Sequence, residues 1–329
     1  MIVGGRLHAP LAVVAALALL WGGTGVGAQS AAQGGMHTVA AQGQVHMIAG
    51  AGGNVTALIG PQGVMLVDAG RIDATEQLLA AIRALTPLPL HFILNTSADP
   101  DHVGGNAAVA KAGRPMPGSN QAAYPEAPIY AHENVHKRMS APGLGERAYE
   151  VPFWPTVTFF TAKRSLYFNG EPIELLWQKA AHTDGDLFVF FRRSDVISAG
   201  DVLDMEKFPQ VDLGRGGGIQ GEIDALNRLI DIAIPRMNQM DGTRIIPGHG
   251  RLTNEADVVE YRDMVTIIRD RVQTLIERGR SLAEVQAARP AYEYEPLYGN
   301  DRGAWTTTMF VEAVYRSLGP RPAAASPVR

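Results

Sequence analysis

Cysteine is absent from the 329-residue sequence, and this absence excludes several kinds of chemistry at once. Without thiols, the chain has no disulfide bond, no thiolate nucleophile and no cysteine-ligated metal. Any metal ion would have to be held by histidine and carboxylate side chains.

The sequence also has little excess charge of either sign. Lysine and arginine number 29 against 33 aspartate and glutamate residues, which gives a formal net charge of −4. Such a balance does not attract the phosphates of nucleic acid, so we expect no nucleic-acid partner. Hydrophobic residues make up 46% of the chain, which provides material for a large core and is typical of a globular protein.

Long apolar runs are missing from the sequence except at its N-terminus. Arg6 precedes apolar residues from Leu11 to Trp21, and small residues follow up to Ala28. This order is typical of a secretory signal peptide, residues 1–28, that is cleaved after Ala28. An uncleaved membrane anchor is the alternative, but the run is short for a span of about 20 residues. We expect export to a bacterial periplasm or the medium, without stable membrane insertion afterwards.

The first half of the mature chain changes from hairpins to β-α-β alternation. Glycine-rich turns separate short strand-like segments, which predicts a meander, and apolar residues at helical spacing then precede another strand. The strands are expected at 45–48, 55–59, 64–67 and 91–95, and the helix over 78–85.

The second half repeats both kinds of element after long irregular stretches at 113–128 and 140–164. Strands are expected at 165–168, 173–178, 187–191, 196–199 and 244–246, and helices at 222–233, 256–278, 281–288 and 306–318. We expect a flexible leader (29–42), a single α/β domain that includes the C-terminal helices (43–320) and a flexible tail (321–329).

Side chains able to bind metal occur in four separate places, each at the end of a predicted strand. They are Asp99, Asp101 and His102 in the first loop, followed by His182, Asp201 and His249, each beside a glycine or a turn. Loops of this kind converge on one edge of an α/β fold, where ligands are bound. One such loop would be a weak signal, but the ordered set supplies the mixed nitrogen and oxygen ligands that a divalent ion needs.

This ordered set resembles the metallo-β-lactamase superfamily, whose signature is a His-x-His-x-Asp-His loop followed by a distant His, a bridging Asp and a final His. The resemblance covers residues 45–250 and implies a four-layer αβ/βα sandwich with a metal site at one edge of its two sheets. It also implies roles for individual residues: Asp101, His102 and His249 in the second metal site, His182 as third ligand of the first site, and Asp201 as the bridge.

The first loop departs from the family pattern. Ser97 and Asp99 stand where the family has its two leading histidines, which weakens the first site and leaves the second whole. Asp99 is therefore interpreted either as an oxygen ligand of the first site or as a general base beside a single ion. The expected cofactor is a divalent metal, Zn²⁺ ahead of Mn or Fe, with one or two ions per chain. Asp99 and Asp101 are the candidate catalytic residues.

The leading functional hypothesis is a secreted hydrolase of a small molecule. A metal-bound hydroxide would attack an ester, lactone, thioester or amide-type carbonyl. With Asp201 as bridge, the ligand set is more similar to glyoxalase II and lactonase relatives than to antibiotic-degrading enzymes. The alternatives are a phosphodiesterase on the same scaffold and a non-catalytic metal-binding periplasmic protein.

Several other residues have both a functional and a structural interpretation. His132 and His136 are spaced to share a helix face, and we expect surface or supporting roles for them. We expect a structural use for Asp184 and Asp186 and a mobile loop over residues 214–218. Lys207 and Arg215 could hold an anionic group of a substrate, but we expect solvated charges. The aromatic residues of the 140–164 stretch fit a core patch and a substrate wall equally well: Phe153, Trp154, Phe159 and Phe160.

Overall fold

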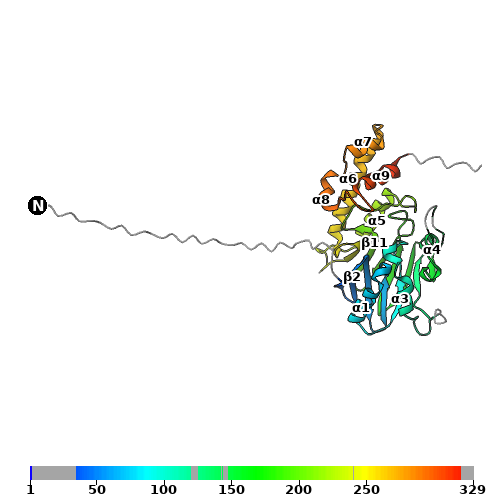
Figure 1. The fold of residues 1–329 in the computed structure, drawn as a ribbon. Helices are drawn as coiled ribbons and strands as arrows, with labels where there is room; N and C mark the ends of the chain where they lie inside the picture. The colour runs from blue at the N-terminus through cyan, green and yellow to red at the C-terminus, as the bar shows by residue number, and fades with distance from the viewer. Residues whose placement is uncertain (2–34, 120–124, 142, 144–146, 240, 320–329) are drawn as a thin grey trace, which may run out of the picture. The chain divides into compact units, whose positions relative to one another are not determined.

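Two β-sheets with helices on their outer faces form the part of the chain that the computed structural model describes (Figure 1). The described residues are 1, 35–119, 125–141, 143, 147–239 and 241–319. The secondary structure all lies within one unit, residues 34–329. The predicted signal peptide with its cleavage point at Ala28, and the predicted tail, lie outside the described residues, Met1 apart.

Within these residues, the first sheet has seven strands in the order in which they occur along the chain. The first four form an antiparallel meander, and the strands from β4 to β7 run parallel. The strands are β1 (His37–Gln42), β2 (Val45–Ala51), β3 (Gly53–Gly60), β4 (Gly63–Val67), β5 (Leu90–Leu94), β6 (Ile129–His132) and β7 (Val157–Phe159).

The second sheet contains six described strands in the order β13-β12-β11-β10-β9-β8. Its strands pair antiparallel except β11 and β12, which are parallel and therefore need a crossover connection, here one that contains a helix. The strands are β8 (Lys163–Phe168), β9 (Glu171–Trp177), β10 (Leu187–Phe191), β11 (Val196–Asp204), β12 (Arg244–His249) and β13 (Thr253–Asn254).

Helices lie on the outer faces of both sheets. Those of the first half are α1 (Thr75–Leu85), α2 (Pro100–Val103), α3 (Asn106–Ala112) and α4 (Glu133–Ser140). Those of the second half are α5 (Ile219–Ile232), α6 (Glu255–Glu277), α7 (Leu282–Ala287), α8 (Glu295–Tyr298) and α9 (Thr307–Leu318). The helix α6 begins with a capping box between Asn254 and Asp257, which fixes its first turn beside β13.

The strand β10 shows how the sequence specifies the layers. All five of its residues are apolar and buried, which is typical of a strand covered on both faces. Leu187, Val189 and Phe191 belong to the core between the sheets, whereas Phe188 and Phe190 belong to the core beneath α5, α6 and α9. A third core lies between the first sheet and the helices α1 and α3. The fold is therefore the expected four-layer αβ/βα sandwich with additional C-terminal helices.

Two differences from the expected elements concern the edges of the first sheet. Residues 37–42, expected to be part of a flexible leader, form β1 and pair with β2. Residues 157–159, within a stretch expected to be irregular, form β7 and pair with β6. Edge strands have weak sequence signals because only one of their sides is paired. Among the described helices, none is long and apolar enough to cross a membrane.

Candidate metal centre

The four predicted loops meet at one edge of the two sheets. Asp99 precedes α2, whose first turn carries Asp101 and His102, and this segment follows β5. His182 lies in the turn between β9 and β10, Asp201 lies on β11, and His249 ends β12. The structure therefore brings all six candidate ligands together, and their donor atoms form two groups: Asp101, His102 and His249, and Asp99, His182 and Asp201.

The first group forms a compact donor set together with Asp201. Oδ1 of Asp201 lies 3.0 Å from Nε2 of His102 and 3.4 Å from Nε2 of His249. Oδ2 of Asp101 lies 3.1 Å from the same nitrogen of His249. The side chain of His102 is fully buried, whereas that of Asp101 is 31% exposed, so the set opens to solvent on one side.

These separations fit a divalent ion. Zinc ligands stand about 2.0–2.2 Å from the ion, which places neighbouring donors of a tetrahedral site a little over 3 Å apart. Two imidazole nitrogens and two carboxylate oxygens at this spacing are a plausible ligand set for zinc. Glycine allows the close approach, since a Cβ on Gly248 would lie 2.3 Å from Oδ1 of Asp201.

Asp68 fixes the orientation of His102. Its Oδ2 lies 2.8 Å from Nδ1 of the imidazole, and its two oxygens also accept hydrogen bonds from the backbone and hydroxyl of Thr96, at 2.8 and 2.6 Å. Because a carboxylate only accepts, the proton of neutral His102 lies on Nδ1, and Nε2 is left with a lone pair for a metal. The sequence analysis missed Asp68, whose only local signal is its place at the end of a buried strand.

His182 is oriented in a similar way in the second group. Its Nδ1 donates to the carbonyl oxygen of Gln210, while its Nε2 lies 2.7 Å from Oδ2 of Asp99 and 3.7 Å from Oδ2 of Asp201. Ser97 is buried beside this group, where its hydroxyl accepts the backbone N–H of Asp99 at 3.2 Å. It fixes the loop in the place where the family has an imidazole.

Arg215 contacts Asp99 directly, which corrects the expectation of a solvated charge. Its Nη1 lies 2.6 Å from Oδ1 of Asp99, and its side chain is only 17% exposed. Nε lies 2.7 Å from Oδ2 of Asp212, so the guanidinium bridges two carboxylates. The sequence signal for this role was the position of Arg215 shortly after the strand that carries Asp201.

Burial and the charges of neighbouring side chains have opposing effects on the pKa of each ligand side chain described here, and the neighbouring charges outweigh burial. Burial would lower the pKa of His102, but the carboxylates of Asp201 and Asp68 raise it well above its usual value. Hydrogen bonds to Asp101 and Asp201 likewise outweigh burial and raise the pKa of His249 to about 10. Burial opposes ionisation of Asp201, yet its pKa is well below the usual range because of His102 and His249. A metal ion would therefore displace protons from this site.

The glycine-rich run after Asp212 packs against the turn that holds His182. Gly217 lies so close that a Cβ there would come within 2.2 Å of the carbonyl oxygen of His182. The backbone N–H of Asp184 donates to the carbonyl of Arg215 at 3.0 Å, and that of Asp212 to His182 at 2.9 Å. Residues 214–218 are thus held against the site by hydrogen bonds, whereas the sequence predicted a mobile loop.

His132 has a structural environment, whereas Lys207 lies near the donor set, where the carboxylates of Asp204, Asp201 and Asp101 outweigh burial and raise its pKa. His132 ends β6 and caps α4 rather than sharing a helix face with His136, and its ring stacks on Trp177 with centroids 4.7 Å apart. It is buried, so a surface role is wrong for this residue. Nζ of Lys207 lies 3.4 Å from Asp204.

The structural interpretation is confirmed for the two aspartates that follow His182. The carboxylate of Asp186 accepts the backbone N–H and the hydroxyl of Thr183, at 2.8 and 2.6 Å, and so closes the turn. Asp184 forms an ion pair of 2.7 Å with Arg138.

The aromatic residues of the 140–164 stretch divide between core and surface. Phe159 is buried between the sheets, and Phe160 is 74% exposed. Phe153 and Trp154 are partly buried over a small cluster that includes Val103 and Met139. The core interpretation therefore holds for three of the four.

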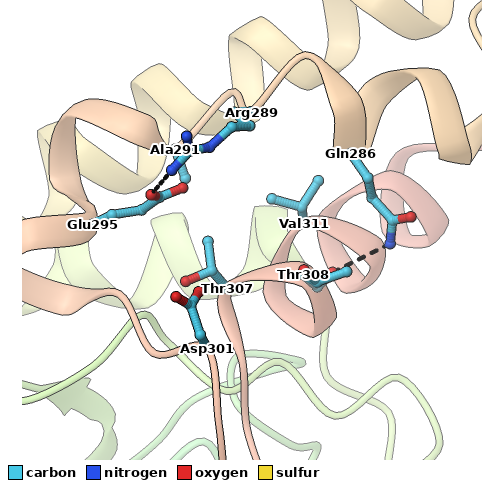
Figure 2. A pocket seen from close by; sticks show the side chains of 8 residues that line it. All are labelled: Gln286, Arg289, Ala291, Glu295, Asp301, Thr307, Thr308 and Val311. Atoms are coloured by element: carbon cyan, nitrogen blue, oxygen red, sulfur yellow. Dashed lines mark hydrogen bonds and ion pairs between the residues drawn. The ribbon is translucent and has the colours of Figure 1, made fainter.

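Two cavities differ in their relation to the site. One of about 310 Å³ borders Asp99 and is lined by Ala98, Asp99, Pro100, Arg138, Arg147, Tyr149 and Arg215. Another of about 280 Å³ lies among the C-terminal helices, and none of the candidate ligands lines it (Figure 2). Figure 2 shows Arg289 of that cavity turned toward Glu295, with which it forms an ion pair. The first cavity is therefore the one next to the candidate centre.

An αβ/βα sandwich with histidines and carboxylates gathered at one sheet edge defines a class of metallohydrolase-like folds. The sequence model of the metallo-β-lactamase superfamily matches residues 49–249, and the chain belongs to that superfamily. Membership suggests a metal-dependent hydrolase. A search of curated proteins gave no match.

Solved structures support the fold. A double mutant of the sec-alkyl sulfatase PisA1 is 14% identical with a TM-score of 0.60, over 86% of this chain and 50% of the sulfatase. The stereoselective inverting sec-alkylsulfatase Pisa1 from Pseudomonas sp. is 13% identical with a TM-score of 0.58 and the same coverage. A metallo-β-lactamase from Pontibacter korlensis is 16% identical with a TM-score of 0.52, over 70% of this chain and 99% of that one. This chain thus spans about half the length of the sulfatases.

Proposed function

We propose that the protein is an exported, metal-dependent hydrolase that cleaves an ester, lactone, thioester or amide-type bond of a small molecule. The observation that carries the proposal is the donor set of Asp101, His102, Asp201 and His249, with separations of 3.0 to 3.4 Å at a partly open rim. When bound there, a divalent ion would polarise the scissile bond and make water acidic enough to attack it.

The protein residues would then orient the reactants and move protons. Asp101 is the most exposed carboxylate of the donor set, so it is the better placed of the two candidate catalytic residues to exchange protons with solvent. Burial would raise the pKa of Asp99, but His182 and Arg215 outweigh this effect and lower it, so Asp99 stays ionised. With both oxygens paired, Asp99 is well placed to hold His182 and Arg215 in position.

A second candidate reaction is hydrolysis of a sulfate or phosphate ester. Arg138, Arg147 and Arg215 all line the cavity beside Asp99, and guanidinium groups bind such oxyanions in bidentate fashion. Each of these arginines also has an acidic neighbour, so the cavity has less excess positive charge than the count of arginines indicates.

One panel of substrates distinguishes these reactions. The purified protein is loaded with Zn²⁺ or Mn²⁺ and assayed on p-nitrophenyl acetate, a simple lactone, p-nitrophenyl sulfate and bis-p-nitrophenyl phosphate. We expect turnover of the carbonyl esters that a chelator abolishes. No turnover of any compound by a metal-loaded chain would favour the non-catalytic metal-binding alternative.

Export has its own test. The apolar run before Ala28 supports a cleaved signal peptide, so protein recovered from the periplasm or the medium should begin at or near Gln29. Intact-mass measurement of that protein decides the point. A soluble periplasmic form that retains Met1 would contradict it.

A further inference from the structure

We propose that the guanidinium of Arg215 takes the place of the first metal ion, so that the centre binds one divalent ion and supplies its second positive charge from the protein. The inference rests on the proposed metal-dependent hydrolysis. It concerns the group formed by Asp99, His182 and Asp201, where the chain departs from the pattern of its superfamily.

The donors of this group are already paired within the protein. Oδ1 of Asp99 lies 2.6 Å from Arg215, and Oδ2 lies 2.7 Å from Nε2 of His182. Ser97 contributes no imidazole, because its hydroxyl is used to accept the N–H of Asp99. A metal at this position would lie beside the guanidinium that pairs with Asp99 and would gain only one histidine, a poor ligand set for zinc.

Charge also opposes a second ion here. The guanidinium is always protonated in a protein, so a cation on Asp99 would face a fixed positive charge at hydrogen-bond range. Among the described residues, the group of Asp101, His102 and His249 forms no ion pair with an arginine or a lysine, because its donors pair with each other, Asp201 and Asp68. The two groups therefore differ in charge although both contain histidine and aspartate.

Asp212 and the packing of the surrounding loop hold Arg215 in place. Asp212 accepts from its Nε at 2.7 Å and, through its other oxygen, from the backbone N–H of Arg215 at 2.9 Å. The glycines that follow allow this loop to pack on the turn of His182, where a Cβ on Gly217 would not fit. The packing of this loop against the turn of His182 therefore fixes the position of Arg215.

The free donors of Arg215 can reach a substrate. A guanidinium has five N–H groups, and the pairs with Asp99 and Asp212 use two of them. Arg215 also lines the cavity of about 310 Å³ beside Asp99. The geometry assigns to it the electrostatic task of a first metal ion, which is to hold a negatively charged oxygen of the substrate or of the transition state.

Metal content tests this independently of turnover. Metal-free full-length protein is titrated with Zn²⁺, and bound ion per chain is measured by elemental analysis after gel filtration. We expect one equivalent for the wild type and for Arg215→Lys. We expect two for the triple variant Ser97→His, Asp99→His, Arg215→Gln, which restores the imidazoles and removes the guanidinium.

Two further variants isolate the arginine. The double variant Ser97→His, Asp99→His retains Arg215 and should bind its second Zn²⁺ at least tenfold more weakly than the triple variant. Arg138→Gln, which removes an arginine of the same cavity that pairs with Asp184, should leave the wild-type stoichiometry of one.

The outcomes separate this inference from the proposed function. Two tightly bound ions in the wild type would overturn the role of Arg215 and leave a metal-dependent hydrolase intact. Equal second-site affinity in the double and triple variants would overturn it as well. A wild type that binds no metal would overturn the proposed function itself.

Discussion

Asp68 and His102 form a buried pair in which Oδ2 of the carboxylate lies 2.8 Å from Nδ1 of the imidazole. Replacing Asp68 by Asn keeps the shape of the side chain but removes the charge that orients and polarises the ring. We expect affinity for Zn²⁺ to fall about 10–100-fold, the usual effect of losing such a partner. Competition with a chromophoric chelator measures it, and affinity equal to the wild type would show that Thr96 and packing alone hold the ring.

His249 provides the simplest test of the donor set. In His249→Ala, the site loses a nitrogen that lies 3.1 Å from Asp101 and 3.4 Å from Asp201, so most bound metal and all hydrolysis should disappear. His136→Ala is a matched control, because that imidazole packs edge-on against Trp154 outside the four loops. Elemental analysis of both variants compares them, and wild-type metal content in His249→Ala would refute the assignment.

The substitution Asp99→Asn removes the negative charge of the side chain and keeps its shape. The variant should retain one bound ion, since the donor set of Asp101, His102, Asp201 and His249 is untouched, but it loses the ion pair with Arg215. If Asp99 acts as a general base, turnover should fall by about 10²–10⁴-fold. Steady-state rates and metal content are measured on the same preparation, and full activity would show that Asp99 takes no part in the reaction.

Gly217 should not tolerate even a methyl group. A Cβ at this position would lie 2.2 Å from the carbonyl oxygen of His182, so Gly217→Ala must displace the loop of Arg215. We expect the free energy of unfolding to drop by about 1–3 kcal/mol, as in overpacked cores. Gly218→Ala is the control, because its nearest atom would be 3.5 Å away. Urea unfolding of the two variants should differ clearly, and equal stabilities would contradict the packing described.

The burial of Glu222 leads to a prediction of how the stability of the fold changes with pH. The side chain is fully buried, and neither of its oxygens has a hydrogen-bond partner among the residues that the structure describes. Burial raises its pKa well above 4.5. The folded state therefore binds a proton that the unfolded chain has released, so stability should fall as pH rises above about 4.5. Glu222→Met should remove this loss and stabilise the protein by about 1–3 kcal/mol at pH 8.

Urea unfolding at pH 5 and pH 8 measures this effect, with Glu222→Gln as the control for charge alone. The glutamine variant should show the flatter pH dependence but a smaller gain in stability, because it keeps polar atoms in an apolar place. An unchanged slope in both variants would mean that other groups control the pH dependence.

The sequence predicted the fold, and it pointed to six candidate ligands whose side chains the structure brings together, because both have local signals. Apolar periodicity marks strands such as β10, and each ligand stands at the end of a strand beside a turn. Asp68 also follows a strand, and Arg215 comes after the strand of Asp201, but neither position indicates a partner, since His102 and Asp99 lie far along the chain. Their roles depend on which loops the topology brings together, and this is settled only in three dimensions.

The donor set also determines when a metal can enter. Asp101 and His102 follow a strand of the first sheet, whereas Asp201 and His249 belong to the second, so neither sheet alone presents the complete set. Contacts between segments this distant in sequence form late, after the cost of closing the intervening chain has been met. The ion would then bind after the two sheets have packed together and would stabilise the folded state, rather than initiate folding. A chain that crosses the membrane unfolded would draw its metal from the compartment in which it folds.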